Sequence, residues 1–241
     1  MIANLPMYQR PELIEAHNLY WSLIRKNLAN VGIDSPEHLS QDAGEMEVWK
    51  RPDLVLSQTC GRPYSTILHE DVTLIGTPDF AVEGCPPGYY RSAFVVHKDD
   101  TRTVLTEFTR AVFAFNAPIS QSGYNAARTE AMKHAFFFEN QICSGGHLNS
   151  MKMIAEKQAD IAAIDAVSLY FAEKYEDFYD QLKIIKWTPP TPSLPYISAL
   201  GSDQEKFFMA IKKAINQLPK EVQKKLKIKD IVMISKDKYF I

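Results

Sequence analysis

The chain has 241 residues, of which 46% are hydrophobic and 23% charged, as in a globular protein with one large core or two lobes of about 100 residues each. A formal net charge of −2 provides no broad positive field for nucleic acid or an anionic membrane, so any bound anion must be held by local groups. No run of about 18 apolar residues predicts a membrane span.

The first 90 residues predict short strands and one long helix. Pro11 suits the first turn of a helix, and apolar residues from Glu12 to Leu28 recur at helical spacing, with Gly32 placed to cap the helix. Residues 1–8 contain neither a basic region nor a long apolar stretch, so no secretory signal is predicted and the chain as written is expected to stay in the cytoplasm. Short apolar or aromatic runs predict strands at 2–7, 54–56, 72–75 and 90–97.

From residue 112 onward, predicted strands and helices alternate. The strands are expected at 112–116, 139–143, 159–164 and 183–187, and the helices at 123–134, 148–157 and 167–182. Such alternation predicts an α/β protein in which parallel strands carry helices on both faces of the sheet.

The segment 188–195 contains four prolines and is expected to be a stiff, extended connection. An amphipathic helix at 203–218 and a lysine-rich tail follow it. We therefore predict two lobes, one formed by residues 1–90 and 189–241 and the other by residues 91–188. Two connections between lobes form a natural hinge, and the cleft that they frame is the expected ligand site.

The sequence from Asn116 to Tyr124 runs from the end of a predicted strand into the start of a helix. Ser120 and Ser122 supply hydroxyl groups, and the first amides of the helix, around Gly123, have no partners within it. The helix dipole adds positive potential at the same place, so this segment predicts an anion-binding site. The alternative is that one of the serines only caps the helix.

A second turn between strand and helix, Cys143-Ser-Gly-Gly-His-Leu-Asn-Ser150, has the same character. Its two glycines permit close approach of the backbone, while Ser144 and His147 offer polar side chains near the helix start. The turn lacks both the Lys-Ser/Thr ending of a P-loop and a Gly-x-Gly-x-x-Gly pattern, which argues against nucleotide binding. The alternative for His147 is a capping or surface histidine.

Asp165 follows a buried apolar strand, at the end where ligands of α/β sheets bind. Its carboxylate is expected either to accept a hydrogen bond from a protonated anion or a ligand amine, or to cap the helix that follows. Loop ends of the first lobe add Tyr8, Ser57 and Thr77 as further candidates, because a tyrosine ring can exclude water from a ligand while its hydroxyl binds it.

The three cysteines, Cys60, Cys85 and Cys143, fit neither a metal-ligand spacing nor a disulfide framework. No metal or cofactor is predicted. Cys60 and Cys85 both follow strand-like runs of the first lobe, so a disulfide between these two is one hypothesis.

Four motifs together, Ser-x-Ser-Gly-Tyr after a strand, Ser-Gly-Gly-His-x-x-Ser, Ala-Asp-Ile-Ala-Ala-Ile-Asp and the proline-rich return, resemble the phosphate and phosphonate substrate-binding proteins of ABC transporters. The resemblance extends from the first strand to about residue 199. It implies a type II periplasmic-binding-protein fold with mixed sheets in two hinged lobes, and a periplasmic location. It also implies that Ser120 and Ser122 hold the oxyanion together with nearby amides. In the same family pattern, His147 is a donor, Asp165 an acceptor and Tyr8 a contact from the first lobe.

We therefore predict a non-catalytic, monomeric solute-binding protein that captures a phosphonate, phosphate or phosphite and serves an ABC permease. Two alternatives stay open: a cytoplasmic sensor or effector-binding module, and an enzyme on the same fold with Cys60 as nucleophile and His147 as base. The predicted ligand residues are Ser120, Ser122, Gly123, Tyr124, Ser144, His147, Asp165, Tyr8, Ser57 and Thr77.

Overall fold

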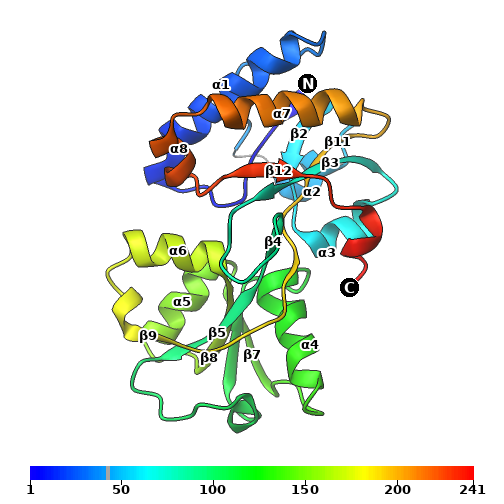
Figure 1. Ribbon diagram of the computed structural model, residues 1–241. Helices are drawn as coiled ribbons and strands as arrows, with labels where there is room; N and C mark the ends of the chain where they lie inside the picture. The colour runs from blue at the N-terminus through cyan, green and yellow to red at the C-terminus, as the bar shows by residue number, and fades with distance from the viewer. Residues whose placement is uncertain (42–43) are drawn as a thin grey trace. The chain divides into compact units, whose positions relative to one another are not determined.

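The computed structural model describes residues 1–41 and 44–241. These form two compact units: unit 1 consists of Met1–Tyr89 and Pro192–Ile241, and unit 2 of Tyr90–Thr191. The chain passes between the units twice, and the strands at these passages, β4 (Tyr89–Tyr90) and β10 (Thr191–Pro192), pair as a two-stranded sheet. Each unit is built on a five-stranded sheet with helices beside it (Figure 1).

The sheet of unit 1 has the strand order β1-β2-β11-β3-β12. β1 is parallel to β2, whereas β11 runs antiparallel to β2 and β3, and β12 runs antiparallel to β3. Because β11 lies between two strands that precede unit 2 in the chain, the sheet of unit 1 needs both of its chain segments. The strands are β1 (Ile2–Ala3), β2 (Leu54–Gln58), β3 (Val72–Asp79), β11 (Tyr196–Ala199) and β12 (Asp230–Val232).

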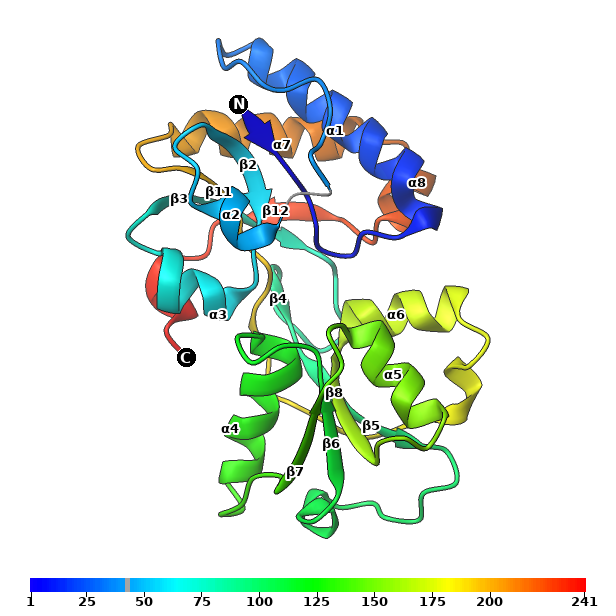
Figure 2. The same cartoon turned by 180° about the vertical axis from the view of Figure 1, so that it is seen from behind.

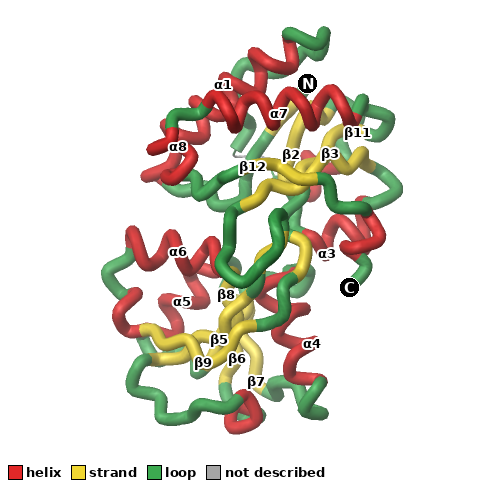
Figure 3. The backbone as a smooth tube through the Cα atoms, in the orientation of Figure 1, coloured by secondary structure: helices red, strands yellow, loops and turns green. Residues whose placement is uncertain are grey.

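Helices pack on both faces of this sheet. α1 (Ile14–Ala29) and α7 (Gln204–Gln217) lie side by side (Figure 3) and share a core with Leu56, Ile75 and Ile231 of the sheet. On the other face of the sheet, Leu54 and Ile197 belong to a second hydrophobic core. The remaining helices of unit 1 are η1 (Pro11–Leu13), α2 (Glu45–Trp49), α3 (Gly61–Pro63), η2 (Tyr64–Leu68), α8 (Lys220–Lys225) and η6 (Lys236–Tyr239).

The N-terminal helix begins and ends where the sequence indicates. Gly32 has a φ of +76°, which glycine adopts without strain, and it lets the amide of Ile33 donate to the carbonyl of Leu28 at 3.0 Å. The strand predicted at 2–7 is wrong in its second half, because β1 ends at Ala3. Pro6 has no amide proton to offer a neighbouring strand.

The sheet of unit 2 has the order β7-β6-β8-β5-β9. β6, β7 and β8 are parallel, but β5 runs antiparallel to both β8 and β9. The parallel strands expected from the alternation are present, and the antiparallel β5 makes the whole sheet mixed, as the family resemblance implies. β5 brings the chain into unit 2, and β9 takes it back along β5. The strands are β5 (Ser92–His97), β6 (Val112–Phe115), β7 (Asn140–Cys143), β8 (Ile161–Asp165) and β9 (Leu182–Trp187).

α4 lies on one side of this sheet and α5 and α6 on the other (Figure 2). Alternate residues along the strands pack toward these two sides. Phe94 and Phe113 pack with α4 (Ala126–Met132), whereas Ala93 and Ala162 pack with α5 (His147–Ala155) and α6 (Ala166–Tyr175). This period of two is what a strand buried on both faces requires. Short helical turns complete unit 2 at η3 (Leu105–Phe108), η4 (Gln121–Asn125) and η5 (Tyr179–Gln181).

The helix predicted at 167–182 is too long. α6 ends at Tyr175, and Glu176 takes an extended conformation with φ −120° and ψ 119°. The apolar residues beyond Tyr175 do not belong to a helix. Phe178, Tyr179 and Leu182 lie in a turn and at the start of β9, and they pack beside the sheet from there.

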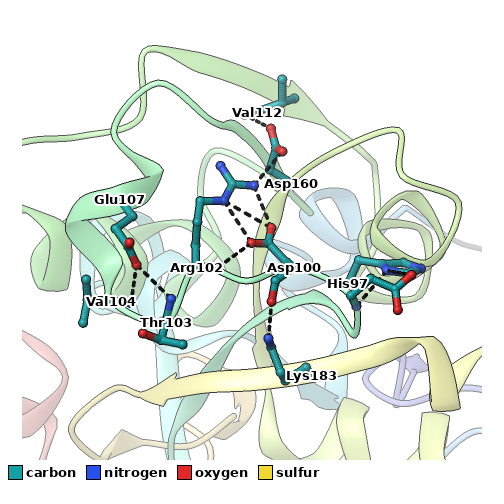
Figure 4. A network of polar contacts seen from close by, with 10 residues as sticks. His97, Asp100, Arg102, Thr103, Val104, Glu107, Val112, Asp160 and Lys183 are labelled. Atoms are coloured by element: carbon teal, nitrogen blue, oxygen red, sulfur yellow. Dashed lines mark hydrogen bonds and ion pairs between the residues drawn. The ribbon is translucent and has the colours of Figure 1, made fainter.

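A network of charged groups joins two loops of unit 2 at the amino ends of β6 and β8 (Figure 4). Arg102 donates from Nη2 to Asp100 at 2.6 Å and to Asp160 at 2.9 Å, and its guanidinium lies 4.2 Å from the centre of the Phe108 ring. The second oxygen of Asp160 accepts the amide of Val112 at 2.8 Å. The network therefore ties the loop after β5 to the starts of the two central parallel strands.

Replacement of Arg102 with alanine is expected to lower the free energy of unfolding at pH 7 by about 1 kcal/mol, because solvent screens a partly exposed ion pair. Arg102 lowers the pKa of Asp100. A carboxyl group with a lowered pKa stabilises the fold above its unfolded pKa of about 3.9, and this contribution is lost as the pH falls through the lower folded value. The difference between wild type and variant should therefore shrink below about pH 4 in urea unfolding.

Arg51 is a suitable control for this experiment, because it binds Asp53 through two partly buried contacts of 2.8 Å that stay within one loop of unit 1. Arg51→Ala should have a smaller effect than Arg102→Ala. Equal effects would contradict a role of the network in joining the two loops.

Candidate functional site

Three helical segments begin at one edge of the unit 2 sheet. β6, β7 and β8 are parallel, so their carboxyl ends meet at the same edge. η4 follows β6, α5 follows β7, and α6 follows β8. Their first amides and their dipoles therefore point positive potential at this edge.

Ser120 caps the first of these helices. Its Oγ accepts the amide of Gly123 at 3.0 Å, and its carbonyl accepts the amide of Asn125 at 3.0 Å. The capping role that the sequence left open for this serine is therefore present. Its hydroxyl proton is not used by the cap, because the oxygen accepts in that contact.

Ser122, His147 and Asp165 form a chain of polar contacts across the three segments. Ser122 Oγ lies 2.9 Å from His147 Nε2, and the same nitrogen lies 3.3 Å from Asp165 Oδ2. The His147 and Asp165 side chains are only 13% and 3% exposed. Residues 25 and 43 positions away from Ser122 are thus brought together by the sheet, not by the local chain.

Asp165 is also the N-cap of α6. Its Oδ1 accepts the amides of Val167 at 3.0 Å and Ser168 at 2.9 Å, and its Oδ2 accepts the hydroxyl of Ser168 at 2.6 Å. Of the two roles considered for Asp165, the structure shows the cap. A buried carboxylate with this many donors is a fixed part of the site.

Burial lowers the pKa of His147, and the Asp165 carboxylate and the Ala163 carbonyl offset this effect only in part. The imidazole is therefore neutral at neutral pH. Beside the Asp165 carboxylate, the cluster offers hydroxyl groups, a neutral ring and helix amides, and these uncharged groups suit a small anion that brings its own charge.

Gly123 lies at the centre of the cluster. A Cβ atom at this position would be 2.0 Å from Asn116 Oδ1 and 2.9 Å from His147 Cε1. Real Cβ contacts are not this short, so only glycine allows Asn116 and His147 to approach the start of η4 together.

The other predicted residues of unit 2 have different surroundings. The Tyr124 ring packs in an aromatic cluster, 4.8 Å from the ring centre of Phe115 and 5.5 Å from that of Phe137. Ser144, in the β7–α5 turn, donates its hydroxyl to the carbonyl of Phe115 in β6 at 3.1 Å, and its oxygen lies 2.7 Å from Ser150 Oγ. The structure thus brings Ser122, Gly123, His147 and Asp165 together and leaves Tyr124 and Ser144 in structural contacts.

The predicted ligand residues of unit 1 make contacts within that unit. Ser57 donates to Asn4 and accepts from Trp49 Nε1, and Thr77 shares a hydrogen bond with the Tyr239 hydroxyl. Both hydroxyl groups are therefore engaged within unit 1, and their ligand roles stay predictions. Tyr8 has a φ of 61°, and its ring centre lies 5.3 Å from that of Phe80; its ligand role stays a prediction.

Asn116 also lies in this cluster, although it is not among the ligand residues predicted from the sequence. It directly follows β6, and its Oδ1 packs over Gly123. The signal that would have found it is its position, because polar residues just after a parallel strand lie at the ligand edge of the sheet.

No disulfide joins Cys60 to Cys85 in the structure, so the hypothesis of such a disulfide is wrong. Within residues 1–41 and 44–241, no group of three His, Cys, Asp or Glu side chains is arranged to hold a metal ion. None of the helices in this described part is both long and apolar enough to cross a bilayer.

Residues 66–239 match the family model described as the ABC transporter, phosphonate, periplasmic substrate-binding protein. The chain belongs to this family. Its fold is the two-lobe α/β fold of type II periplasmic binding proteins. As a family, these proteins are the substrate-binding components of transporters.

Solved structures agree with the fold. A protein from Xanthomonas citri bound to ATP has a TM-score of 0.74 at 13% identity, with 99% of this chain and 94% of that chain covered. The PhnD1 protein of Prochlorococcus marinus in complex with methylphosphonate has a TM-score of 0.73 at 15% identity, with 100% and 94% covered. A binding-protein component of a phosphonate transporter from Pseudomonas aeruginosa has a TM-score of 0.73 at 15% identity, with 99% and 82% covered. No curated protein matches the sequence.

Proposed function

We propose that this member of the family binds a small oxyanion of the phosphonate class at the carboxyl edge of the unit 2 sheet and serves an ABC permease. The observation that carries the proposal is the contact between Ser122 and His147 at the start of two helices. Helix amides and neutral donors stabilise an anion without a cationic side chain. The methylphosphonate complex of the similar PhnD1 protein supports phosphonate over other anions.

The same three side chains argue against catalysis. In a Ser-His-Asp triad, the serine and the carboxylate contact different nitrogens of the imidazole, so that the carboxylate orients the ring while the serine gives up its proton. Here Ser122 Oγ and Asp165 Oδ2 both lie beside Nε2. A nucleophile activated in the way of a triad is not what this geometry supports. The alternative with Cys60 as nucleophile has no observation that favours it.

Calorimetric titration tests the proposal directly. Methylphosphonate, 2-aminoethylphosphonate, phosphite and phosphate are the ligands to compare, with sulfate as the anion of similar shape. The proposal requires binding heat with at least one phosphorus oxyanion. No heat and no thermal shift with any of them would overturn it.

Ser122→Ala is expected to weaken methylphosphonate binding by roughly 10- to 100-fold, because a buried hydrogen bond to a charged ligand is worth about 1–3 kcal/mol. Thr109→Ala is the matched control, since its hydroxyl donates to the carbonyl of Thr106 at 2.8 Å in the same unit. The control should bind like wild type. Wild-type affinity in Ser122→Ala would assign Ser122 to local structure alone.

The transporter partner is a separate part of the proposal. Co-purification of the ligand-loaded protein with a phosphonate permease in detergent would support it. Binding of methylphosphonate without retention by a permease would favour a sensory or buffering role instead.

A further inference from the structure

The side-chain amide of Asn116 lies beside the proposed ligand donors but comes from a different element. Its backbone is held at the end of β6, where the amide of Ser144 donates to the carbonyl of the preceding Phe115 at 2.8 Å, and the thiol of Cys143 lies 3.7 Å from the carbonyl of Asn116. The position of Asn116 is therefore set by the strand pair β6–β7 and not by a helix.

The two ends of this amide have different surroundings. Oδ1 is buried and accepts no hydrogen bond from any described residue. It packs over Gly123 beside the Cε1 carbon of His147. The hydrogens on the Gly123 Cα and on His147 Cε1 carry partial positive charge, because these carbons are bonded to electron-withdrawing groups. An amide oxygen is therefore more favourable at this place than an NH2 group.

The nitrogen at the other end, Nδ2, has no hydrogen bond within the described part of the chain. Unlike Oδ1, it is not a buried atom without a partner, so solvent reaches it. Oδ1 is fixed by packing, so the two N–H groups of Nδ2 are left available for another molecule.

We propose that Asn116 is a further ligand residue, whose Nδ2 donates to one oxygen of the bound anion; this inference rests on the proposed function. Donors then come from three elements: Asn116 after β6, Ser122 in η4 and the first amides of α5. Three directions of donation match the three oxygens of a tetrahedral phosphonate better than the two oxygens of a planar carboxylate. The ligand class is therefore a tetrahedral oxyanion with an unprotonated oxygen facing Asn116.

Asn116→Asp gives the sharpest test, because it keeps the shape of the side chain but replaces the donor with a negative charge. Methylphosphonate affinity is expected to fall by more than about 100-fold in this variant, since it loses a donor and gains repulsion. Asn116→Ala, which only removes the donor, is expected to lose roughly 5- to 50-fold. Acetate should bind at least about 100-fold more weakly than methylphosphonate to the wild-type protein if three donors are matched.

Asn140→Asp is the matched control, because it makes the same charge change in unit 2 at an exposed residue whose Nδ2 bonds to the carbonyl of Arg110. It should leave the affinity unchanged. Circular dichroism and thermal unfolding verify the fold of each variant, and Asn116→Ala carries the test if the aspartate variant does not fold.

The outcomes separate the two proposals. If wild type binds methylphosphonate, Ser122→Ala weakens it and the Asn116 variants bind within twofold of wild type, the assignment of Asn116 is overturned while the proposed function stands. If wild type does not bind any phosphorus oxyanion, both are overturned. A selective loss in Asn116→Asp, with Asn140→Asp unchanged, supports the assignment.

Discussion

Gly123→Ala is expected to destabilise unit 2 by about 1–3 kcal/mol and to abolish measurable methylphosphonate binding. The added methyl group would lie 2.0 Å from Asn116 Oδ1, 2.8 Å from Asn116 Cγ and 2.9 Å from His147 Cε1. Either Asn116 rotates away or η4 shifts, and both changes displace proposed donors. Urea unfolding and calorimetric titration measure the two effects.

Gly146→Ala is the control for this substitution. Gly146 precedes α5 in the same unit, its φ of −174° is open to any residue, and an added Cβ would have no neighbour closer than 3.9 Å. Its stability should change by less than about 1 kcal/mol. A cost equal to that of Gly123→Ala would show that the loss of glycine, and not the clash, is responsible.

The contact with Asn116 can be isolated by a double substitution. In Asn116→Ala/Gly123→Ala, the most severe clash is removed, while the 2.9 Å approach to His147 remains. The loss of stability should therefore be smaller than the sum of the single losses, by about 1 kcal/mol. Additive losses would contradict direct packing of Asn116 on Gly123.

Asp165→Ala is expected to lower the free energy of unfolding by about 2–4 kcal/mol, because it removes a helix cap and leaves buried donors without an acceptor. The amides of Val167 and Ser168 and the hydroxyl of Ser168 all lose their partner. Asp165→Asn should lose less, since an amide oxygen can still accept both amides.

Asp203→Ala provides a matched comparison. Asp203 caps α7 by accepting the amide of Lys206 at 3.1 Å, but it is solvent-exposed and has no histidine beside it. Its loss should cost about 1 kcal/mol. Equal costs for the two substitutions would show that Asp165 acts as an ordinary cap.

Removal of the Asp165 charge is also expected to change the pKa of His147. The Asp165 carboxylate raises the pKa of this histidine against the effect of burial, so its removal should lower the pKa further. An NMR titration of the His147 ring in wild type and Asp165→Asn measures the direction. A higher pKa in the variant would contradict the electrostatic coupling of the two residues.

Several local features follow from the chain alone. The N-terminal helix and its glycine cap, the strands near residues 54 and 72, and the order of strand, turn and helix from residue 112 onward all agree with the structure. They depend on neighbouring residues, through apolar period and turn chemistry, so nearby sequence is sufficient. The family motifs are likewise local, and the match over residues 66–239 agrees with them.

Other features depend on which strands become neighbours, and no local signal carries that information. The reversal of β5 in the unit 2 sheet depends on long-range pairing. So does the approach of Ser122 to His147 and of both to Asp165. In the sequence, Ser120, Ser122 and Ser144 are three similar serines near the start of a helix. In the structure, Ser120 caps η4, Ser122 contacts His147, and Ser144 contacts Ser150.

The residue types and the turns between strands and helices were therefore sufficient to indicate an anion-binding α/β protein of this family. Which hydroxyls stay available, and that Asn116 lies beside them, emerged only from the folded chain. The physical reason is that the role of a hydrogen-bonding group depends on which groups lie around it. In this site those groups are tens of residues away in sequence.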